Sequence, residues 1–261
     1  MTITPSTTPH IITLFGLPLC AVTFAEAVEM LSHTAGVVHG RARVVVTPNV
    51  DHMVRLERMP EFATRYSQAD FIFADGMPLV WFSRFIGRPL PQRVTGSDLF
   101  VALCNKAIEH SWHVVIIGGR PGNEAELQER FRQRFGGMRV SVIAPSMGFD
   151  PAGSEADAIA ARVTEIDPDL VFVCVGFPRQ ELWAFNHAGR LRRGLVLCVG
   201  AAFEFALGMQ KRAPRWMQEV GLEWLWRLLS EPRRLWRRYL VESWSFVRLC
   251  WHEWKQRPHG Q

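Results

Sequence analysis

The sequence lacks the long apolar run that a membrane-spanning helix requires. No window reaches the roughly 18 uninterrupted apolar residues needed to cross a bilayer, although the chain is 48% hydrophobic. The apolar segment from Ile11 to Leu31 does not fit a signal peptide, because no Lys or Arg precedes it, Pro18 interrupts it, and Glu26 lies where a leader stays apolar. We expect a strand followed by an amphipathic helix in this segment. At 261 residues the chain is long enough to bury a full core.

Motifs for metal binding and for several enzyme classes are also missing. The five cysteines form no CxxC pair and the nine histidines show no metal-ligand spacing, which predicts reduced core thiols in a cytosolic protein and no zinc site. The absence of GxSxG, Walker A and HExxH motifs argues against several hydrolase and kinase classes. Asp167-Pro168-Asp169 resembles the metal-binding D-x-D of sugar transferases, but it precedes a predicted strand, so we interpret it as a turn on the opposite side of the sheet. We expect no metal and no cofactor.

Charge and tryptophan are unevenly distributed along the chain. Residues 1–210 carry 19 Lys and Arg against 20 Asp and Glu, whereas residues 211–261 carry 11 against 5. The last segment also holds seven of the ten tryptophans. We therefore expect a terminal segment that differs in kind from the rest of the protein.

Apolar strands alternate with helical patterns through most of the chain, which predicts an α/β fold with a Rossmann-like parallel sheet and helices on both faces. The domains we expect are a loose arm over 1–10, a catalytic core over 11–210 in two lobes (about 11–110 and 111–210), and a helical appendage over 211–261. Strands are expected over 11–15, 43–47, 71–74, 112–117, 139–143, 170–175 and 195–199. Helices are expected over 23–34, 50–58, 61–67, 77–86, 123–135, 154–166, from Ser97 or Asp98 to about His110, and from about 180 to His187.

An acid follows one of these predicted strands. Asp75 and Gly76 come directly after the apolar run that starts at Phe71, and ligands of open α/β sheets bind at the carboxyl ends of strands. A carboxylate with apolar surroundings is a candidate general base, because partial burial raises its pKa toward the working pH. The alternative is that Asp75 only caps the helix that follows it.

Two further loops follow strands. Gly118 and Gly119 precede a helix, where free N–H groups favour a phosphate, but the GxGxxG spacing is absent and a plain glycine turn is an equal alternative. Arg179, Gln180 and Glu181 stand together at a helix start, on the edge of the sheet that also holds the acid if the strands are parallel. An Arg here can neutralise a phosphate and a Gln can hold a hydroxyl. The alternative is a capped helix with solvated charges.

The terminal segment has a basic amphipathic pattern. Apolar residues recur at helical spacing after Pro232, with arginines on the other faces; they are Trp236, Leu240, Trp244, Val247, Trp251 and Trp254. Such a helix is typical of proteins that lie in a membrane interface and prefer anionic lipid. A hairpin packed on the core and a dimer face, and hence a homo-oligomer, are the alternatives. Nucleic acid is disfavoured, because the aromatic side chains form a stripe instead of interleaving with the arginines.

Together these stretches resemble the WecG/TagA/CpsF family of bacterial glycosyltransferases over nearly the whole chain. The motifs that carry the resemblance are Thr47-Pro-Asn49, Ala74-Asp75-Gly76, Arg93-Val-Thr-Gly96, Gly118-Gly119, Gly176-Phe-Pro-Arg-Gln-Glu181, Val199-Gly-Ala-Ala-Phe-Glu-Phe205, Lys211-Arg-Ala-Pro214, Leu222-Glu-Trp224 and the spaced residues Arg227, Arg234, Arg237 and Tyr239. One departure is Glu204, where the family pattern has Asp.

The resemblance implies an inverting, metal-independent transfer from a UDP-sugar to a polyprenyl-diphosphate-linked sugar in cell-surface or exopolysaccharide assembly, by a peripheral protein on the cytoplasmic face of the inner membrane. The donor sugar is UDP-glucose, UDP-N-acetylmannosamine or its uronic acid, and we favour UDP-glucose. Asp75 is the expected base, with Gln180 as the second catalytic residue. Substrate binding is expected from Thr47, Asn49, Arg93, Gly118, Gly119, Arg179, Glu181, Arg227, Arg234 and Arg237.

A second function class stays open from the sequence. A non-catalytic nucleotide-binding membrane scaffold would use the same sheet without needing Asp75 as a base. A UDP-sugar isomerase or epimerase is a minor possibility, since it would need NAD and the dinucleotide glycine spacing is absent.

Overall fold

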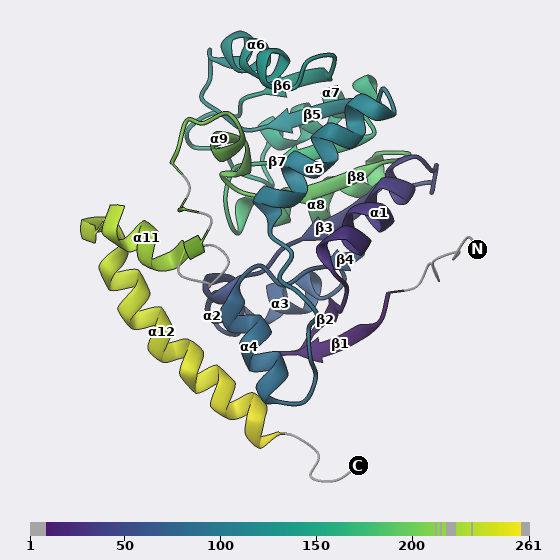
Figure 1. Ribbon diagram of the computed structural model, residues 1–261. Helices are drawn as coiled ribbons and strands as arrows, with labels where there is room; N and C mark the ends of the chain where they lie inside the picture. Colours follow the sequence, from purple (N-terminus) through teal and green to yellow (C-terminus); the bar gives the residue numbers. More distant parts are fainter. Residues whose placement is uncertain (1–8, 212, 215, 218–222, 231, 257–261) are drawn as a thin grey trace.

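The protein is built on one six-stranded parallel sheet. The computed structural model describes residues 9–211, 213, 214, 216, 217, 223–230 and 232–256 (Figure 1). The strands lie in the order β4-β3-β8-β7-β5-β6, and each pairs in parallel with its neighbours. They are β3 (Arg43–Val46), β4 (Phe71–Ile72), β5 (His113–Ile117), β6 (Arg139–Ile143), β7 (Leu170–Val173) and β8 (Leu195–Cys198). The predicted parallel α/β fold is therefore confirmed.

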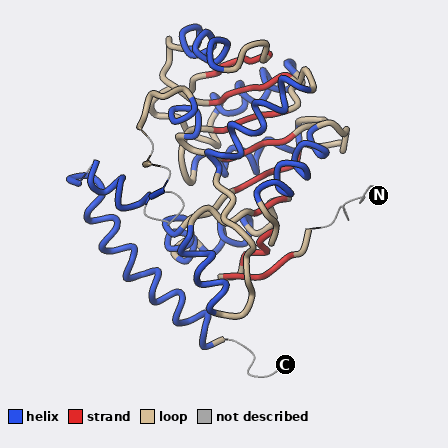
Figure 2. Tube along the Cα trace, viewed as in Figure 1, coloured by secondary structure: helices blue, strands red, loops and turns tan. Residues whose placement is uncertain are grey.

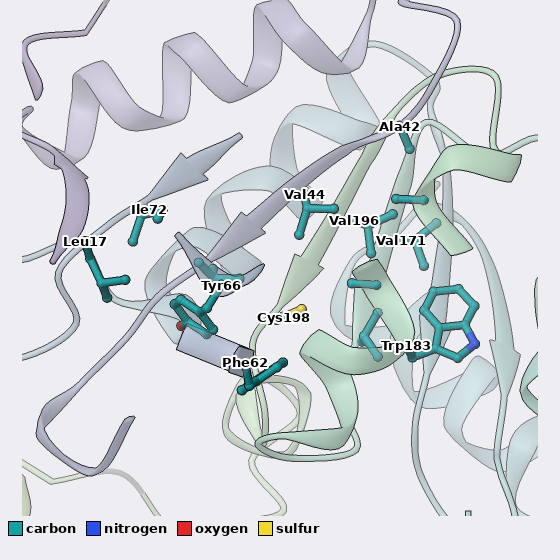
Figure 3. Packing of buried hydrophobic residues seen from close by; sticks show 14 of the residues in the cluster. Leu17, Ala42, Val44, Phe62, Tyr66, Ile72, Val171, Trp183, Val196 and Cys198 are labelled. Carbon is teal, nitrogen blue, oxygen red and sulfur yellow. The ribbon is translucent and has the colours of Figure 1, made fainter. Parts of the chain in front are cut away.

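Side chains alternate across the sheet and feed two separate cores. Along β3, Val45 belongs to the core cluster that contains Leu99, whereas Val44 and Val46 belong to the cluster that contains Trp183 on the other face, as the two-residue period of a strand requires. The first face is covered by α1 (Phe24–Ala35), α5 (Gly96–Glu109), α6 (Glu124–Arg134) and α9 (Ala202–Ala206). The second is covered by α2 (Val50–Glu57), α3 (Pro60–Tyr66), α7 (Ser154–Ile166) and α8 (Arg179–His187). Figure 2 shows the helices on both sides of the strands, and Figure 3 shows part of the second core.

The start of the chain differs from the prediction. The segment from Ile11 forms a two-stranded antiparallel hairpin, β1 (Ile11–Leu14) and β2 (Leu17–Cys20), where only one strand was expected. Phe15 and Gly16 turn the chain with φ of 53° and 74°. Pro18 fits β2 because this sheet has only edge strands, which tolerate a residue without an N–H. The short helix α9 was likewise not anticipated.

The structure confirms the expected turn at Asp167–Asp169 and corrects the expected cap of α5. Asp169 directly precedes β7 and accepts a hydrogen bond from His113 N at 2.8 Å. The Asp167–Asp169 turn therefore lies at the amino ends of the strands, opposite their carboxyl ends, as expected.

The cap of α5 is different from the prediction: Thr95 accepts a hydrogen bond from Asp98 N at 3.1 Å, and neither Ser97 nor Asp98 is the cap. The hydroxyl of Thr95 can reach the free N–H groups of the first turn, which is what an N-cap requires.

The terminal helices are α11 (Glu223–Ser230) and α12 (Pro232–Lys255), and Figure 1 shows α12 as one long helix. Helix α12 packs against α2 and beside the hairpin, and α11 contacts α12. Phe246 contacts Phe15 with ring centroids 5.7 Å apart, and Arg248 pairs with Glu57 at 3.0 Å. The predicted helix start at Pro232 is confirmed. The division of the core into two lobes stays a prediction, and the strands of both halves join one sheet through the β3–β8 pair.

Two features are absent from the part of the chain that the structure describes. No helix in the described ranges combines the length and apolarity needed to span a bilayer. Over the same ranges, His, Cys, Asp and Glu side chains form no cluster of three or more that could hold a metal ion.

Candidate active site

The carboxyl ends of the parallel strands bring most of the predicted site residues to one edge of the sheet. Thr47 and Asn49 follow β3, Asp75 follows β4, and Gly118 follows β5. The loop from Gly176 to Glu181 follows β7 and leads into α8. Because all six strands run in the same direction, these loops share one edge, where α/β proteins bind ligands.

Asp75 is held by the backbone of neighbouring loops. Its N–H donates to Pro48 O at 2.9 Å, and its Oδ2 accepts from Gly96 N at 3.2 Å. The helix that follows it, α4 (Met77–Phe85), has Gly76 as its N-cap and no side-chain capping bond. The interpretation of Asp75 as a cap for that helix is therefore wrong. Its carboxylate instead meets the first residue of α5.

Gly96 is packed tightly between the ends of β3 and β8. A Cβ atom at this position would lie 2.9 Å from Thr47 Oγ1 and 3.3 Å from Val199 Cγ1. Thr47 is buried, at 6% exposure. Only a glycine fits here without displacing these neighbours. The close packing therefore fixes the distances between the start of α5, the end of β3 and the end of β8.

Asn49 is the N-cap of α2, whether or not it also contacts a ligand. Its Oδ1 accepts from His52 N at 3.2 Å and caps α2. The His52 ring stacks on Phe177 with centroids 4.4 Å apart, and Arg55 lies over the same ring at 4.5 Å. Thus α2 connects the loop after β3 to the loop after β7.

Arg93 connects the core to the terminal helices. Its Nη1 lies 3.6 Å from Glu223 Oε2, and both side chains are mostly buried, at 16% and 19% exposure. Glu223 is the first residue of α11, and Arg227 follows one turn later in the same helix. The side chains of Arg227, Arg234 and Arg237 lie outside the described part of the chain, so their place over the site stays a prediction.

Gly118 and Gly119 are required by packing. The N–H of Gly118 donates to Ile143 O at 2.9 Å, and a Cβ on this residue would lie 2.8 Å from Cys174 Cβ. Gly119 has a φ of +95°, and a Cβ there would lie 2.5 Å from Leu127 Cδ1. Since the Gly118 N–H is already used, any phosphate contact from this loop would come from Gly119 or the residues after it. Phosphate binding here stays a prediction.

The residues that open α8 differ sharply in exposure. Arg179 is exposed, and its Nη2 donates to Val175 O at 2.9 Å. Gln180 and Glu181 are buried, at 2% and 0% exposure. Gln180 Nε2 donates to Glu181 Oε1 at 2.8 Å, and Gln180 Oε1 accepts from Gly200 N at 3.0 Å. The roles expected for this pair in catalysis and substrate binding remain predictions, and the structure shows both side chains bonded inside the protein.

Burial changes the ionisation of Glu181. Loss of water raises the pKa of its carboxyl to about 7, although the Gln180 hydrogen bond and the nearby Arg55 charge act in the opposite direction. The fully buried Tyr66 lies close enough for the Glu181 and Asp75 charges to raise the pKa of its hydroxyl, in addition to the larger effect of burial. A titratable group therefore lies beneath the edge of the sheet that carries Asp75.

Sequence reasoning missed some of the residues that shape this site. Tyr66 ends a helix with no motif around it, so nothing in the sequence indicated that it lies near Asp75. Gly96 and Glu223 belonged to recognised motifs, but their contacts connect segments that are far apart in the chain and become visible only in three dimensions.

Comparisons with known proteins identify the family of the chain. The profile of the "Glycosyl transferase WecG/TagA/CpsF family" matches residues 12–260. A curated protein of Bacillus spizizenii named N-acetylglucosaminyldiphosphoundecaprenol N-acetyl-beta-D-mannosaminyltransferase is 33% identical over 218 residues, which cover 83% of this chain and 82% of the relative.

Proposed function

This chain belongs to the WecG/TagA/CpsF family of glycosyl transferases, and from that premise we propose that it transfers a sugar from a UDP-sugar to a polyprenyl-diphosphate-linked sugar with inversion at the anomeric carbon. The observation that carries the proposal is the setting of Asp75. Its carboxylate stands beyond the carboxyl end of β4 and accepts from Gly96 N, the residue that packs closely against Thr47, and it does not serve as the cap of its own helix.

In the proposed reaction Asp75 acts as the general base. Its carboxylate takes the proton from the acceptor hydroxyl, and the resulting oxygen attacks C1 of the donor sugar from the face opposite the nucleotide. The bond between C1 and the phosphate oxygen breaks, and its electron pair leaves with UDP. One displacement of this kind inverts the configuration at C1, and a positioned base contributes about 10²- to 10⁴-fold to such a step.

The leaving diphosphate needs positive charge, because negative charge develops on it as the bond breaks. Arg179 is exposed at the carboxyl edge of the sheet, and Arg93 stands at the contact with α11. We assign diphosphate binding to these two residues, joined by Arg227, Arg234 and Arg237 from the terminal helices. A guanidinium suits this task because its planar donors match phosphate oxygens.

The name of the relative narrows the proposed substrates. That protein transfers N-acetylmannosamine to N-acetylglucosaminyl-diphosphoundecaprenol according to its name. We therefore place UDP-N-acetylmannosamine ahead of UDP-glucose as the donor for this chain, with a polyprenyl-diphosphate-linked N-acetylglucosamine as the acceptor.

A lipid-linked acceptor calls for a membrane surface, and α12 offers a face for it. Phe246 and Leu249 pack on the core, whereas Trp244, Val247 and Trp251 on the other side are 77%, 58% and 52% exposed. We propose that this exposed face lies in the anionic cytoplasmic leaflet of the inner membrane, because tryptophan with nearby basic residues suits that interface.

The experiment is UDP release by the full-length protein in detergent. UDP-N-acetylmannosamine, its uronic acid and UDP-glucose are each offered with polyprenyl-diphosphate-linked N-acetylglucosamine or glucose. Release above the rate of hydrolysis with one pair, and an inverted linkage in the product, is the expected result. Binding of UDP-sugars without turnover for any pair would contradict the proposal and favour a nucleotide-binding scaffold.

A further inference from the structure

We propose that Glu181 is a positioning residue, which acts through the Gln180 side chain to fix the end of β8 and so the spacing around Asp75. The proposal deepens the function proposed above and rests on it only where turnover is measured. It assigns to Glu181 a role without direct contact with substrate.

The hydrogen bonds form a continuous chain. Glu181 Oε1 accepts from Gln180 Nε2 at 2.8 Å, and Gln180 Oε1 accepts from Gly200 N at 3.0 Å. Glu181 has no exposed surface and Gln180 is 2% exposed. A side chain without exposed surface has no atom to offer a sugar or a phosphate, so the carboxylate acts on what it touches, and it touches Gln180.

The chain of contacts continues to the base. Gly200 directly follows Val199, whose Cα and Cγ1 atoms would lie 3.4 Å and 3.3 Å from a Cβ on Gly96. Gly96 in turn donates its N–H to Asp75 Oδ2 at 3.2 Å. A shift of the β8 end would therefore press on Gly96 or release it, and either change moves the partner of the Asp75 carboxylate. Displacements of about 1 Å at a reacting group are enough to cost roughly 10²-fold in rate.

A carboxylate is suited to hold an amide in one orientation. The two ends of a Gln amide are similar in shape but opposite in hydrogen bonding, since the oxygen accepts and the nitrogen donates. Gly200 N requires the amide oxygen, which leaves the amide nitrogen to donate to Glu181 Oε1. Glu181 thereby selects the orientation in which Gln180 holds Gly200. Without Glu181 the amide can rotate, and a buried donor is left without a partner.

The groups around the Glu181 carboxyl belong to the protein core. Burial raises the pKa of the Tyr66 hydroxyl and of the Cys198 thiol, the nearby Glu181 charge raises both further, and the Arg55 charge of α2 acts on Glu181 itself. Figure 3 shows Tyr66 and Cys198 in the core on the α3 and α8 side of the sheet. The carboxyl of Glu181 is therefore enclosed by α2, α3, α8 and β8.

The first test measures the hydrogen bond itself. In protein labelled with ¹⁵N-glycine, the amide exchange rate of Gly200 is followed by NMR in the wild type, Glu181→Ala and Glu181→Gln. We expect the amide exchange rate of Gly200 to rise about tenfold or more in Glu181→Ala, because a change of that size corresponds to the free energy of one hydrogen bond. Glu181→Gln keeps an oxygen that can accept from Gln180, so its protection is expected to stay near that of the wild type. Unchanged exchange in a folded Glu181→Ala would overturn the proposal.

If Glu181→Ala does not fold, exchanging the residue types at positions 180 and 181 provides a second test of the same hydrogen bonds. At a pH high enough to ionise both carboxyls, Gln180→Glu leaves Gly200 an acceptor but places two acceptors against each other, whereas the double variant Gln180→Glu with Glu181→Gln restores one donor between them. Low protection of Gly200 in the single variant and recovery in the double variant support the proposal. Equal protection in both overturns it.

The second test measures turnover with the donor and acceptor that the wild type uses. We expect Glu181→Ala to lower kcat about 10- to 100-fold with KM little changed, and we expect Glu181→Gln to retain most of the wild-type kcat.

The matched control is Trp183→Phe, which removes a buried hydrogen bond from the same helix, the bond from Trp183 Nε1 to Ala156 O at 3.3 Å. This variant is expected to lower Tm without the same loss of kcat. A higher KM at unchanged kcat would mean direct substrate contact and overturn the proposal. A wild type without turnover would contradict the proposed function, while Gly200 exchange would still decide the role of Glu181.

Discussion

At the scale of single residues, the site depends on a glycine, Gly96, at the start of α5. Gly96 lacks a Cβ, and this lets the start of α5 lie against Thr47 and Val199 and deliver its N–H to Asp75. The Asp75 carboxylate is therefore held in part by the backbone N–H of Gly96, at a distance that the missing Cβ allows.

Gly96→Ala tests this close packing. The added methyl would lie 2.9 Å from Thr47 Oγ1, so either Thr47 or the start of α5 must shift. We expect kcat to fall roughly tenfold or more, although alanine otherwise favours a helix.

Gly136→Ala is a suitable control for the loss of a glycine, because no non-neighbouring atom lies within 4 Å of a Cβ at that position and Gly136 precedes β6, at the edge of the sheet opposite the site. A Gly96→Ala protein that turns over like the wild type would show that Asp75 does not depend on this contact.

The sequence was informative about which residues belong to the site and less so about how each acts. The polar residues after β3, β4 and β7 could be identified because strand ends carry ligands in this fold class. That Gln180 and Glu181 are buried could not be predicted, since exposed and buried charges at a helix start have the same sequence pattern. The cap of α5 was misplaced because Thr95, Ser97 and Asp98 are all capable of capping.

At the scale of elements, most helices and strands of the sheet could be predicted from hydrophobic periodicity. The hairpin β1–β2 was missed because Pro18 suggests an interruption, and its tolerance in an isolated two-stranded sheet depends on tertiary structure. The five-residue helix α9 is too short for a helical period to show.

The contact between α11 and the core is the element-scale feature with the clearest functional consequence. The Arg93–Glu223 pair joins the loop before α5 to the first turn of α11, the helix that also carries Arg227. An acid in the first turn also suits the helix dipole. We infer that this pair holds the appendage in register with the site.

Glu223→Arg is expected to release α11 from the core. Hydrogen exchange of the peptide that covers residues 223–230 should rise, and kcat/KM should fall about tenfold, which corresponds to roughly 1.4 kcal/mol. The charge-swapped double variant Arg93→Glu with Glu223→Arg should restore protection of the peptide, while turnover stays low because Arg93 is also assigned to the diphosphate.

The exposed pair of Lys106 with Glu109, 3.0 Å apart on α5, provides the control, and Glu109→Arg should change neither quantity measurably. Unaltered exchange of α11 in Glu223→Arg would show that the pair does not hold this helix.

At the scale of the whole molecule, the order of strands was beyond sequence reasoning. The alternation of strands and helices predicts a parallel sheet, but the order β4-β3-β8-β7-β5-β6 depends on which connections cross and which do not. This order places β3 next to β8, and so brings Thr47 against Val199 and Gly96. The site is therefore assembled by topology from residues that are about 150 positions apart in the chain.

The aromatic face of α12 gives a prediction about the molecule as a whole. The wild type is expected to bind vesicles that contain phosphatidylglycerol and to bind pure phosphatidylcholine vesicles less. Trp244→Ser with Trp251→Ser should weaken this binding about tenfold or more, because each ring buries up to ~200 Å² in an interface.

Met147→Ser is the control for the loss of an exposed apolar side chain, since Met147 is 78% exposed and follows β6, away from α12. Vesicle binding that is unaffected by the double substitution would contradict the membrane assignment. If the substitution instead changed the oligomeric state in solution, the face would be a subunit interface.

The most direct test of the central claim is the turnover of Asp75→Asn in detergent, with the donor and acceptor that the wild type uses. The matched control is Asp98→Asn, which replaces a carboxylate in the first turn of α5 whose bond with Thr95 an amide oxygen can still accept. If Asp75 is the base, kcat of Asp75→Asn falls by about 10²-fold or more with KM little changed, whereas Asp98→Asn stays within a few-fold of the wild type. Turnover of Asp75→Asn at the wild-type rate would contradict the assignment of the base and with it the proposed mechanism.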